Sequence, residues 1–337
     1  GGVTSIMDMP NTNPLTVTLD ALNAKLDLLN EKCIVNHSCY FGATNNNYTE
    51  FDKLDKHRVC GIKLFMGSST GNMLVDKMNS LLNIFNGTDM LIAAHCEDQE
   101  TIKNNIEKYK QKYKGADDIP VSAHPSIRSV PACYASSELA VRLAKIAGAR
   151  LHILHVSTAK ELQLFSDEPL ASKNITAEAC VAHLLFTLTH YNSLGTRIKC
   201  NPAVKRKTDR EALRAAVNSG LIDVIATDHA PHLLNEKEGG ALKAMSGMPM
   251  IQFSLVSMLE LVDEGVFSLE TVVQKMCHAP ARIYGICHRG YIREGYQADL
   301  VLVRPNSPWE VSADKILSKC GWSPLEGHTF NWKVEKT

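Results

Sequence analysis

The stretch Ile222-Asp223-Val224-Ile225-Ala226-Thr227-Asp228-His229-Ala230-Pro231-His232 begins as an apolar run and ends in one carboxylate and two imidazoles. Its first four residues predict a short buried β-strand, so the polar side chains follow at the carboxyl end of that strand. In α/β barrels this end of the strands carries the chemistry. An acidic turn that caps the next helix is the alternative, because a short motif by itself also occurs by chance.

Three other apolar runs also carry a residue of the kind that binds metals, namely 61–65 around Lys63, 91–95 with His95 and 151–155 with His155. A buried lysine must be paired, neutralised or modified, unless it lies at a strand end and reaches solvent. A single histidine at a strand end is usually a hydrogen-bonded core residue. Two of them on neighbouring parallel strands, with Asp228 on a third, form a convergent set of nitrogen and carboxylate ligands, which suits Zn²⁺.

Apolar runs alternate with helical patterns along the chain, which indicates a parallel sheet covered on both faces. We expect strands at 3–9, 33–40, 61–65, 90–95, 151–156, 175–180 and 222–225, helices at 16–32, 97–115, 132–147, 158–165 and 209–219, and a loop at 120–131. Seven strands predict an α/β protein with a TIM-like (β/α)8 barrel that lacks its first strand, over residues 1–297. A partial small β-sandwich domain is expected at 298–337. A doubly wound sheet is the alternative, but Pro10-Asn11-Thr12 is not the glycine-rich phosphate loop that it requires.

The formal net charge is zero, which gives no support to a nucleic-acid-binding surface. Ten cysteines without a CxxC pair are typical of reduced thiols, and hence of a cytoplasmic protein. No apolar run approaches the ~18 residues that a membrane helix needs. The chain starts and stops within what we expect to be structural elements, so we interpret it as a fragment cut at both ends.

Eight motifs carry a resemblance to a known family. They are Met9-Pro10-Asn11-Thr12 with Pro14, Gly61-Ile62-Lys63-Leu64-Phe65, Ala94-His95-Cys96-Glu97, His152-Ile153-Leu154-His155-Val156-Ser157, Lys199-Cys200-Asn201-Pro202, Thr227-Asp228-His229-Ala230-Pro231-His232, Ala298-Asp299-Leu300-Val301-Leu302, and Leu317-Ser318-Lys319-Cys320-Gly321-Trp322-Ser323-Pro324 with Glu326-Gly327. In these motifs the chain resembles the dihydroorotases of the amidohydrolase superfamily, in order over nearly its whole length.

The resemblance implies a zinc-dependent hydrolase of cyclic amides, which interconverts N-carbamoyl-L-aspartate and L-dihydroorotate in de novo pyrimidine (UMP) biosynthesis. Lys63 matches a lysine that is carboxylated by CO₂ and bridges two zinc ions. His95 and His155 match ligands of one ion, and Asp228 matches the last ligand and the proton shuttle. A carbamate would also remove the problem of a buried positive charge at Lys63.

Other positions match contacts to the substrate. Asn11, Asn201 and His232 match side chains that hold it, and the backbone of Ser246 and Gly247 lies where relatives hold the pyrimidine ring. The implied partner is a small molecule, with neither nucleic acid nor membrane, and a homodimer is left open. The segment 233–245 is either a flap over the site or a solvated loop.

The family's first strand carries a His-x-His metal pair and a nearby arginine for the substrate carboxylate, and this chain has no His-x-His. That strand would precede Gly1, so we interpret its loss as truncation. Some members of the superfamily use an aspartate of a glycine-rich loop in place of the lysine, but Gly67-Ser68-Ser69-Thr70-Gly71 contains none. A hydantoinase-like or allantoinase-like enzyme and a catalytically silent homologue remain alternatives.

Overall fold

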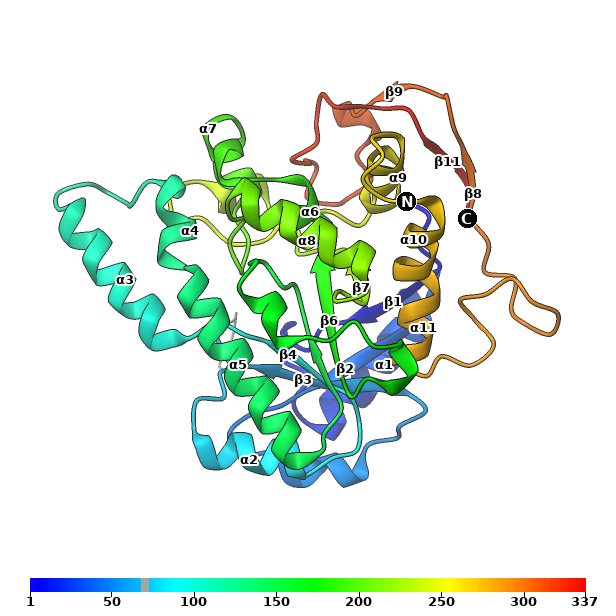
Figure 1. The fold of residues 1–337 in the computed structure, drawn as a ribbon, viewed down its shortest axis with the longest axis horizontal. Helices are drawn as coiled ribbons and strands as arrows, with labels where there is room; N and C mark the ends of the chain where they lie inside the picture. The colour runs from blue at the N-terminus through cyan, green and yellow to red at the C-terminus, as the bar shows by residue number, and fades with distance from the viewer. Residues whose placement is uncertain (68–72) are drawn as a thin grey trace.

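The computed structural model describes residues 1–67 and 73–337, and within them seven parallel strands form one sheet in the order β1-β2-β3-β4-β5-β6-β7 (Figure 1). Their bounds are β1 Ser5–Asp8, β2 Asn36–Gly42, β3 Val59–Phe65, β4 Ile92–His95, β5 Leu151–Ile153, β6 Ile175–Cys180 and β7 Val224–Ala226. Each strand pairs with the next one along the chain, which is the connectivity of a (β/α) barrel. The predicted barrel-like fold is therefore confirmed.

Helices lie outside the strands (Figure 1). Their bounds are α1 Leu19–Lys32, α2 Met78–Asn86, α3 Gln99–Lys112, α4 His124–Ile127, α5 Val130–Ala147, α6 Val181–Leu185, α7 Tyr191–Leu194, α8 Lys207–Ser219, α9 Ser254–Asp263, α10 Leu269–Val273 and α11 Ala279–Ile283. The helix α5 buries a row of small and aliphatic side chains, including Ala140, Val141 and Ala144, and so packs closely on the sheet. This packing holds the strand ends at fixed places.

The structure differs from the sequence-based expectations in several elements. The expected loop at 120–131 contains α4, and α2 and α9 lie where no helix was expected. The expected helix at 158–165 is a 3₁₀ turn, Glu161–Leu164. The strand predicted at 151–156 stops at Ile153, because His155 takes a positive φ of 39° and leaves the extended conformation.

The C-terminal part of the chain packs on the barrel. Its strands form two antiparallel pairs, β8 Leu302–Arg304 with β11 Lys333–Lys336, and β9 Trp309–Glu310 with β10 Thr329–Phe330. The rings of Phe330 and of Phe253, just before α9, stack with their centroids 6.2 Å apart in the same hydrophobic core. The domain boundary predicted at residue 297 stays a prediction.

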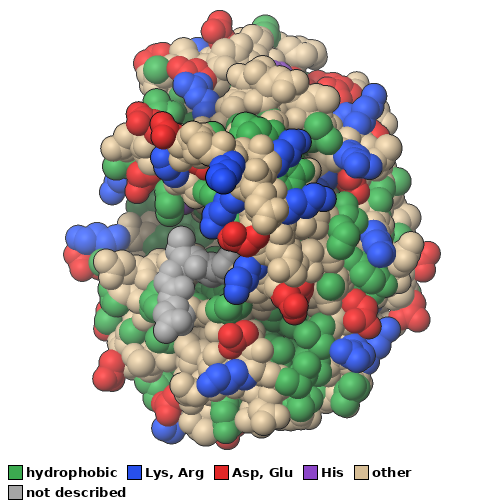
Figure 2. Space-filling view, turned by 90° about the vertical axis from the view of Figure 1, so that its left-hand side faces the viewer, with side chains coloured by type: hydrophobic (Ala, Val, Ile, Leu, Met, Phe, Trp, Pro, Cys, Tyr) green, Lys and Arg blue, Asp and Glu red, His purple; other side chains and the backbone are tan. Residues whose placement is uncertain are grey.

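The surface carries charges of both signs. On the face shown in Figure 2, cationic and anionic side chains are interspersed. Among the described residues, no helix combines the length and apolar character needed to span a bilayer. All ten cysteines are free thiols, as the sequence predicts.

Candidate active site

Two imidazoles face each other at the carboxyl end of the sheet. His95 ends β4, and His155 follows β5 by two residues. The Nδ1 atom of His95 lies 3.0 Å from the Nε2 atom of His155, and the rings meet edge to face with their centroids 4.8 Å apart. Both rings are buried, and burial lowers the pKa of each, so both are neutral and keep nitrogen lone pairs.

Backbone strain marks two of the predicted site residues. Within the described residues, His155 and Asp228 are two of four non-glycine residues with a positive φ, 39° and 43° respectively. Such conformations cost free energy and persist where the surrounding structure enforces them, commonly at functional sites. Each one lies two residues after a barrel strand, so the strain turns these side chains at the same edge of the sheet.

Lys63 lies inside β3 and only 2% of its surface is exposed. Burial lowers its pKa to about 7, although Cys96, Asp228 and Glu178 act in the opposite direction. Burial also raises the pKa of Asp228 to about 6, the negative charge of Glu178 adds to this effect, and Lys63 opposes it. Lys63 and Asp228 therefore influence each other's charge across the barrel.

Two buried carboxylates support the histidines, and the sequence analysis assigned a role to neither. Glu97 lies 3.2 Å from Nε2 of His95 and also pairs with Arg128. Burial acts to raise the pKa of Glu97. The positive charge of Arg128 and the hydrogen bond with His95 outweigh this effect and lower the pKa to about 2. This carboxylate is therefore charged and orients the His95 ring, as carboxylates beside metal-binding histidines do.

Glu178 lies on β6, and its Oε1 atom accepts a hydrogen bond of 3.2 Å from the backbone N–H of His155. Its Oε2 atom lies 3.4 Å from Nε2 of His152. The sequence does contain a signal for Glu178, since a carboxylate in the apolar run 175–180 is as unusual as Lys63 in the run 61–65. Glu178 holds the strained backbone of His155 in place.

The nitrogen pair fits one zinc ion. Two nitrogen ligands at ~2.0–2.1 Å from a tetrahedral ion lie roughly 3.3 Å apart, which is close to the 3.0 Å between His95 and His155. The second ring nitrogen of His155 is buried without a hydrogen-bond partner. Within residues 1–67 and 73–337, no three His, Cys, Asp or Glu side chains group closely enough to hold an ion by themselves. His95 and His155 could therefore hold an ion only together with further ligands. The glycine-rich loop 67–71, which contains no aspartate to bridge two ions, lies mostly outside the described residues.

The predicted substrate contacts lie beyond this pair. Asn201 follows a buried segment, and its Oδ1 atom is buried without a hydrogen-bond partner. Burial lowers the pKa of His232, and the Ser246 backbone acts in the opposite direction. Gly247 has a φ of 143°, and a Cβ atom there would lie 2.5 Å from the Ala230 carbonyl oxygen, so only glycine fits. Asn11 follows β1 at the carboxyl edge of the sheet.

Other histidines have structural partners. The Nε2 atoms of His124 and His183 lie 2.9 Å and 3.0 Å from the backbone carbonyl oxygens of Cys200 and Pro202. The Nδ1 atom of His229 accepts a hydrogen bond from the backbone N–H of Ile251, at 3.2 Å. The ligand-like geometry is therefore confined to His95 and His155 among these residues.

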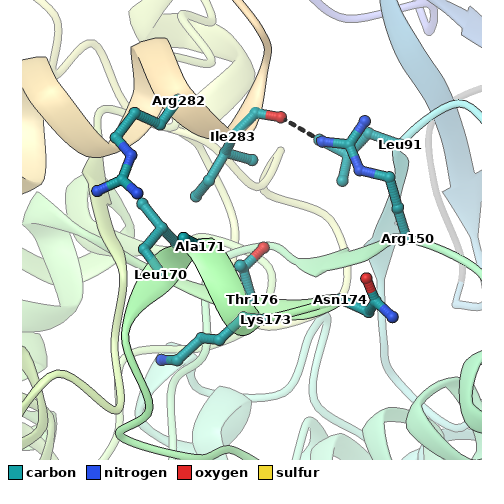
Figure 3. Close-up of a pocket in the computed structure, with 9 residues that line it drawn as sticks. All are labelled: Leu91, Arg150, Leu170, Ala171, Lys173, Asn174, Thr176, Arg282 and Ile283. Carbon is teal, nitrogen blue, oxygen red and sulfur yellow. Dashed lines mark hydrogen bonds between the residues drawn. The ribbon is translucent and has the colours of Figure 1, made fainter.

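A cavity of about 290 Å³ lies at the opposite, amino end of the strands (Figure 3). Its lining residues are Leu91, Arg150, Leu170, Ala171, Lys173, Asn174, Thr176, Arg282 and Ile283. The Arg150 guanidinium donates to the Ile283 carbonyl oxygen, at 2.6 Å. None of the predicted site residues lines this cavity, and this end of a barrel generally serves stability.

Comparison with known proteins settles the family. The model of the amidohydrolase family matches residues 1–322. The chain belongs to this family. It is 32% identical to a dihydroorotase of Halobacterium salinarum, over 97% of this chain and 75% of that protein. It is 30% identical to an allantoinase of Bacillus velezensis, over 100% of this chain and 74% of that protein.

Solved structures agree with the family. The L-hydantoinase of Arthrobacter aurescens superposes with a TM-score of 0.92 at 28% identity, over 100% of this chain and 77% of that one. The resemblance to dihydroorotases is thus confirmed, and the protein is a cyclic amide hydrolase of the amidohydrolase family. The amidohydrolase superfamily is generally metal-dependent.

Proposed function

We propose that the protein is a dihydroorotase, which cyclises N-carbamoyl-L-aspartate to L-dihydroorotate in de novo pyrimidine biosynthesis. The facing nitrogens of His95 and His155, 3.0 Å apart at the carboxyl end of the sheet, are the observation that carries a hydrolytic metal site there. The dihydroorotase relatives, such as those of Halobacterium salinarum and Pyrococcus furiosus, support this substrate.

His95, His155, Asp228 and a carboxylated Lys63 would hold zinc, with two ions expected per subunit. When bound, zinc supplies polarisation of the amide carbonyl and makes water acidic enough to attack at neutral pH. The Lys63 amine attacks the carbon of CO₂ and loses a proton, which gives a carbamate anion. Its burial and its pKa of about 7 support this modification, because carboxylation needs a neutral amine.

Asp228 moves the proton in the proposed reaction. In the hydrolytic direction its carboxylate takes a proton from the attacking water and delivers it to the ring nitrogen that leaves, and cyclisation runs these transfers in reverse. The raised pKa of about 6 suits this exchange, because an acid–base catalyst works best with a pKa near the working pH. Asn11, Asn201 and His232 make hydrogen bonds with the substrate, and the backbone of Ser246 and Gly247 holds the ring.

The unpartnered Oδ1 atom of Asn201 supports a ligand at this place, since buried polar atoms are otherwise nearly always hydrogen-bonded. The rival function is hydrolysis of hydantoin or allantoin, which the structural similarity to an L-hydantoinase and the sequence similarity to an allantoinase favour. A catalytically silent homologue is the remaining alternative. We propose further that the protein is cytoplasmic.

A substrate panel separates these functions. The full-length, zinc-loaded protein is assayed with dihydroorotate, carbamoyl aspartate, hydantoin and allantoin, before and after chelation. We expect turnover of the first two and its loss on chelation. Turnover of hydantoin or allantoin without turnover of dihydroorotate or carbamoyl aspartate would show that the proposed substrate is wrong. Inactivity on all four compounds would identify a catalytically silent homologue.

A further inference from the structure

The segment that contains Ser246 and Gly247 is fixed by a buried lysine that the proposed reaction does not use. Lys237 ends the 3₁₀ turn Leu234–Lys237, and 2% of its surface is exposed. Its Nζ atom donates to the carbonyl oxygens of Met245 and Gly247, both at 2.7 Å, and to that of Lys199, at 3.1 Å. An ammonium group has three N–H donors, and here each has a backbone acceptor.

These three contacts join separate parts of the candidate site. Lys199 lies two residues before Asn201, and its carbonyl oxygen also accepts the backbone N–H of Gly247, at 2.8 Å. The carbonyl oxygen of Met248 accepts a hydrogen bond of 3.1 Å from the backbone N–H of Ala230, which lies two residues after Asp228. Lys237 therefore lies where the segments of Asn201, Asp228 and Gly247 meet.

His232 is connected to the same place. It lies five residues before Lys237, and its carbonyl oxygen accepts a hydrogen bond of 2.7 Å from Nε1 of Trp322. The Nζ atom of Lys237 lies 5.8 Å from the centre of the Trp322 ring. The lysine thus packs behind the residues proposed to hold the substrate and does not point outward.

The amine of Lys237 is held by carbonyl oxygens and not by a carboxylate: burial lowers its pKa to about 7, and none of the ion pairs found among the described residues includes it. The amine adds a fixed arrangement of three carbonyl groups, which sets the backbone of Ser246 and Gly247 relative to His232 and Asn201.

We propose that Lys237 is a positioning residue, which holds the backbone of Ser246 and Gly247 in the geometry that binds the amide ring of the substrate. The inference rests on the proposed ring contact, but not on which cyclic amide is used. Loss of Lys237 should weaken binding of rings with and without a carboxylate group alike. Displacement of a positioning group by ~1 Å is enough to lower the efficiency of an enzyme by up to about a hundredfold.

The test compares Lys237→Met and Lys237→Gln with the parent in the full-length, zinc-loaded protein. Lys275→Met is the matched control, because Lys275 is a half-buried lysine that donates to one carbonyl oxygen, that of Ile222, at the far end of β7. Steady-state kinetics with dihydroorotate and hydantoin are measured with amide hydrogen exchange over residues 244–248.

For Lys237→Met we expect KM to rise at least about tenfold for every ring that the parent turns over, with kcat within about threefold. Amide hydrogen exchange at 244–248 should accelerate in Lys237→Met. The KM and exchange rates of Lys237→Gln should lie between those of the parent and of Lys237→Met, because the glutamine amide keeps two donors. Lys275→Met should match the parent in KM and in exchange at 244–248.

An unchanged KM with unchanged exchange in Lys237→Met, or in Lys237→Gln if the methionine variant does not fold, would overturn the inference. A loss of kcat without a change in KM would overturn it as well. If the parent turns over no cyclic amide, the proposed function fails; the exchange rates then still decide whether Lys237 holds this segment, and parental exchange would overturn the inference.

Discussion

The positive φ angles of His155 and Asp228 connect backbone geometry to chemistry at single residues. Most side chains with branched or bulky groups avoid this region, since Cβ approaches the backbone. In this protein Glu178 holds the His155 N–H, so a buried carboxylate stabilises the strained turn. The backbone conformation thus contributes to the direction in which these two residues, predicted to bind metal and to move protons, extend their side chains.

Lys63 carries the sharpest prediction at this scale. Lys63→Ala should remove most bound zinc and lower the rate at least about a hundredfold, because a bridging carbamate cannot form. Short carboxylic acids should restore part of both. Lys275→Ala is the control, since Lys275 donates to a carbonyl oxygen outside the site. Full zinc content and rate in Lys63→Ala would make Lys63 a structural strand residue.

Which of the site residues could be predicted depends on what identifies them. Lys63, His95, His155 and Asp228 stand out because each interrupts or ends an apolar run, and parallel strands bring such ends together. Lys237 lacks that signal, because it lies in a polar stretch and is buried through contacts with Lys199 and Gly247. Its three acceptors are backbone atoms, which no sequence pattern reveals.

At the scale of elements, the segment 233–245 is anchored, which decides against a freely solvated loop. Asp118 accepts hydrogen bonds from the backbone N–H groups of Gly240, Leu242 and Lys243, at 2.6 Å, 3.1 Å and 2.9 Å. Withdrawal from water acts to raise the pKa of Asp118, but these bonds and that of Ile119 hold it below its usual value. The segment is therefore pinned by a charged acceptor.

Removal of this acceptor should free the segment. Asp118→Ala leaves the three N–H groups of the segment and that of Ile119 without their partner, and we expect faster proteolysis within 239–244 and a loss of about 1–3 kcal/mol in the free energy of local opening, measured by hydrogen exchange. Asp117→Ala is the neighbouring control. Equal protease sensitivity in both variants would show that Asp118 does not anchor the segment.

Helices with a clear apolar periodicity and a cap followed from the sequence, whereas α2, α4 and α9 did not. The helix at 19–32 begins after Thr18, whose side chain accepts the N–H of Ala21, and such a cap is readable from residue type. By contrast α4 has four residues, too few for a 3.6-residue periodicity to appear. Its place is set by contacts with α3 and not by its own pattern.

At the scale of the whole molecule, the C-terminal part is joined to the barrel by an ion pair as well as by the hydrophobic core. His328, just before β10, places its Nε2 atom 2.9 Å from both carboxylate oxygens of Glu260 on α9. The hydrogen bond to Glu260 raises the pKa of His328, burial opposes this, and the charges of Glu260 and Glu264 add to it. This contact should make the stability of the whole protein depend on pH.

The direction of that dependence follows from proton binding. The folded protein holds the His328 proton more tightly than the unfolded chain, whose histidine pKa is about 6.5. The stabilisation is therefore fully present below about pH 6.5 and disappears as the pH rises through the higher folded pKa. Because 40% of the His328 side chain is exposed, water and salt screen the pair, and the effect should stay below about 1 kcal/mol.

Urea unfolding of the parent and of His328→Gln at about pH 5.5 and pH 9 measures this term. At the lower pH the parent should have a larger free energy of unfolding than His328→Gln. This difference between the two proteins should shrink at the higher pH, and also in high salt, because salt screens exposed charges. His37→Gln is the control, since the His37 ring contacts the Val35 carbonyl oxygen and Asn30 and no carboxylate. A difference for His328→Gln that is the same at both pH values would mean that the contact stabilises by packing, because only a proton-linked pair loses its contribution when the histidine becomes neutral.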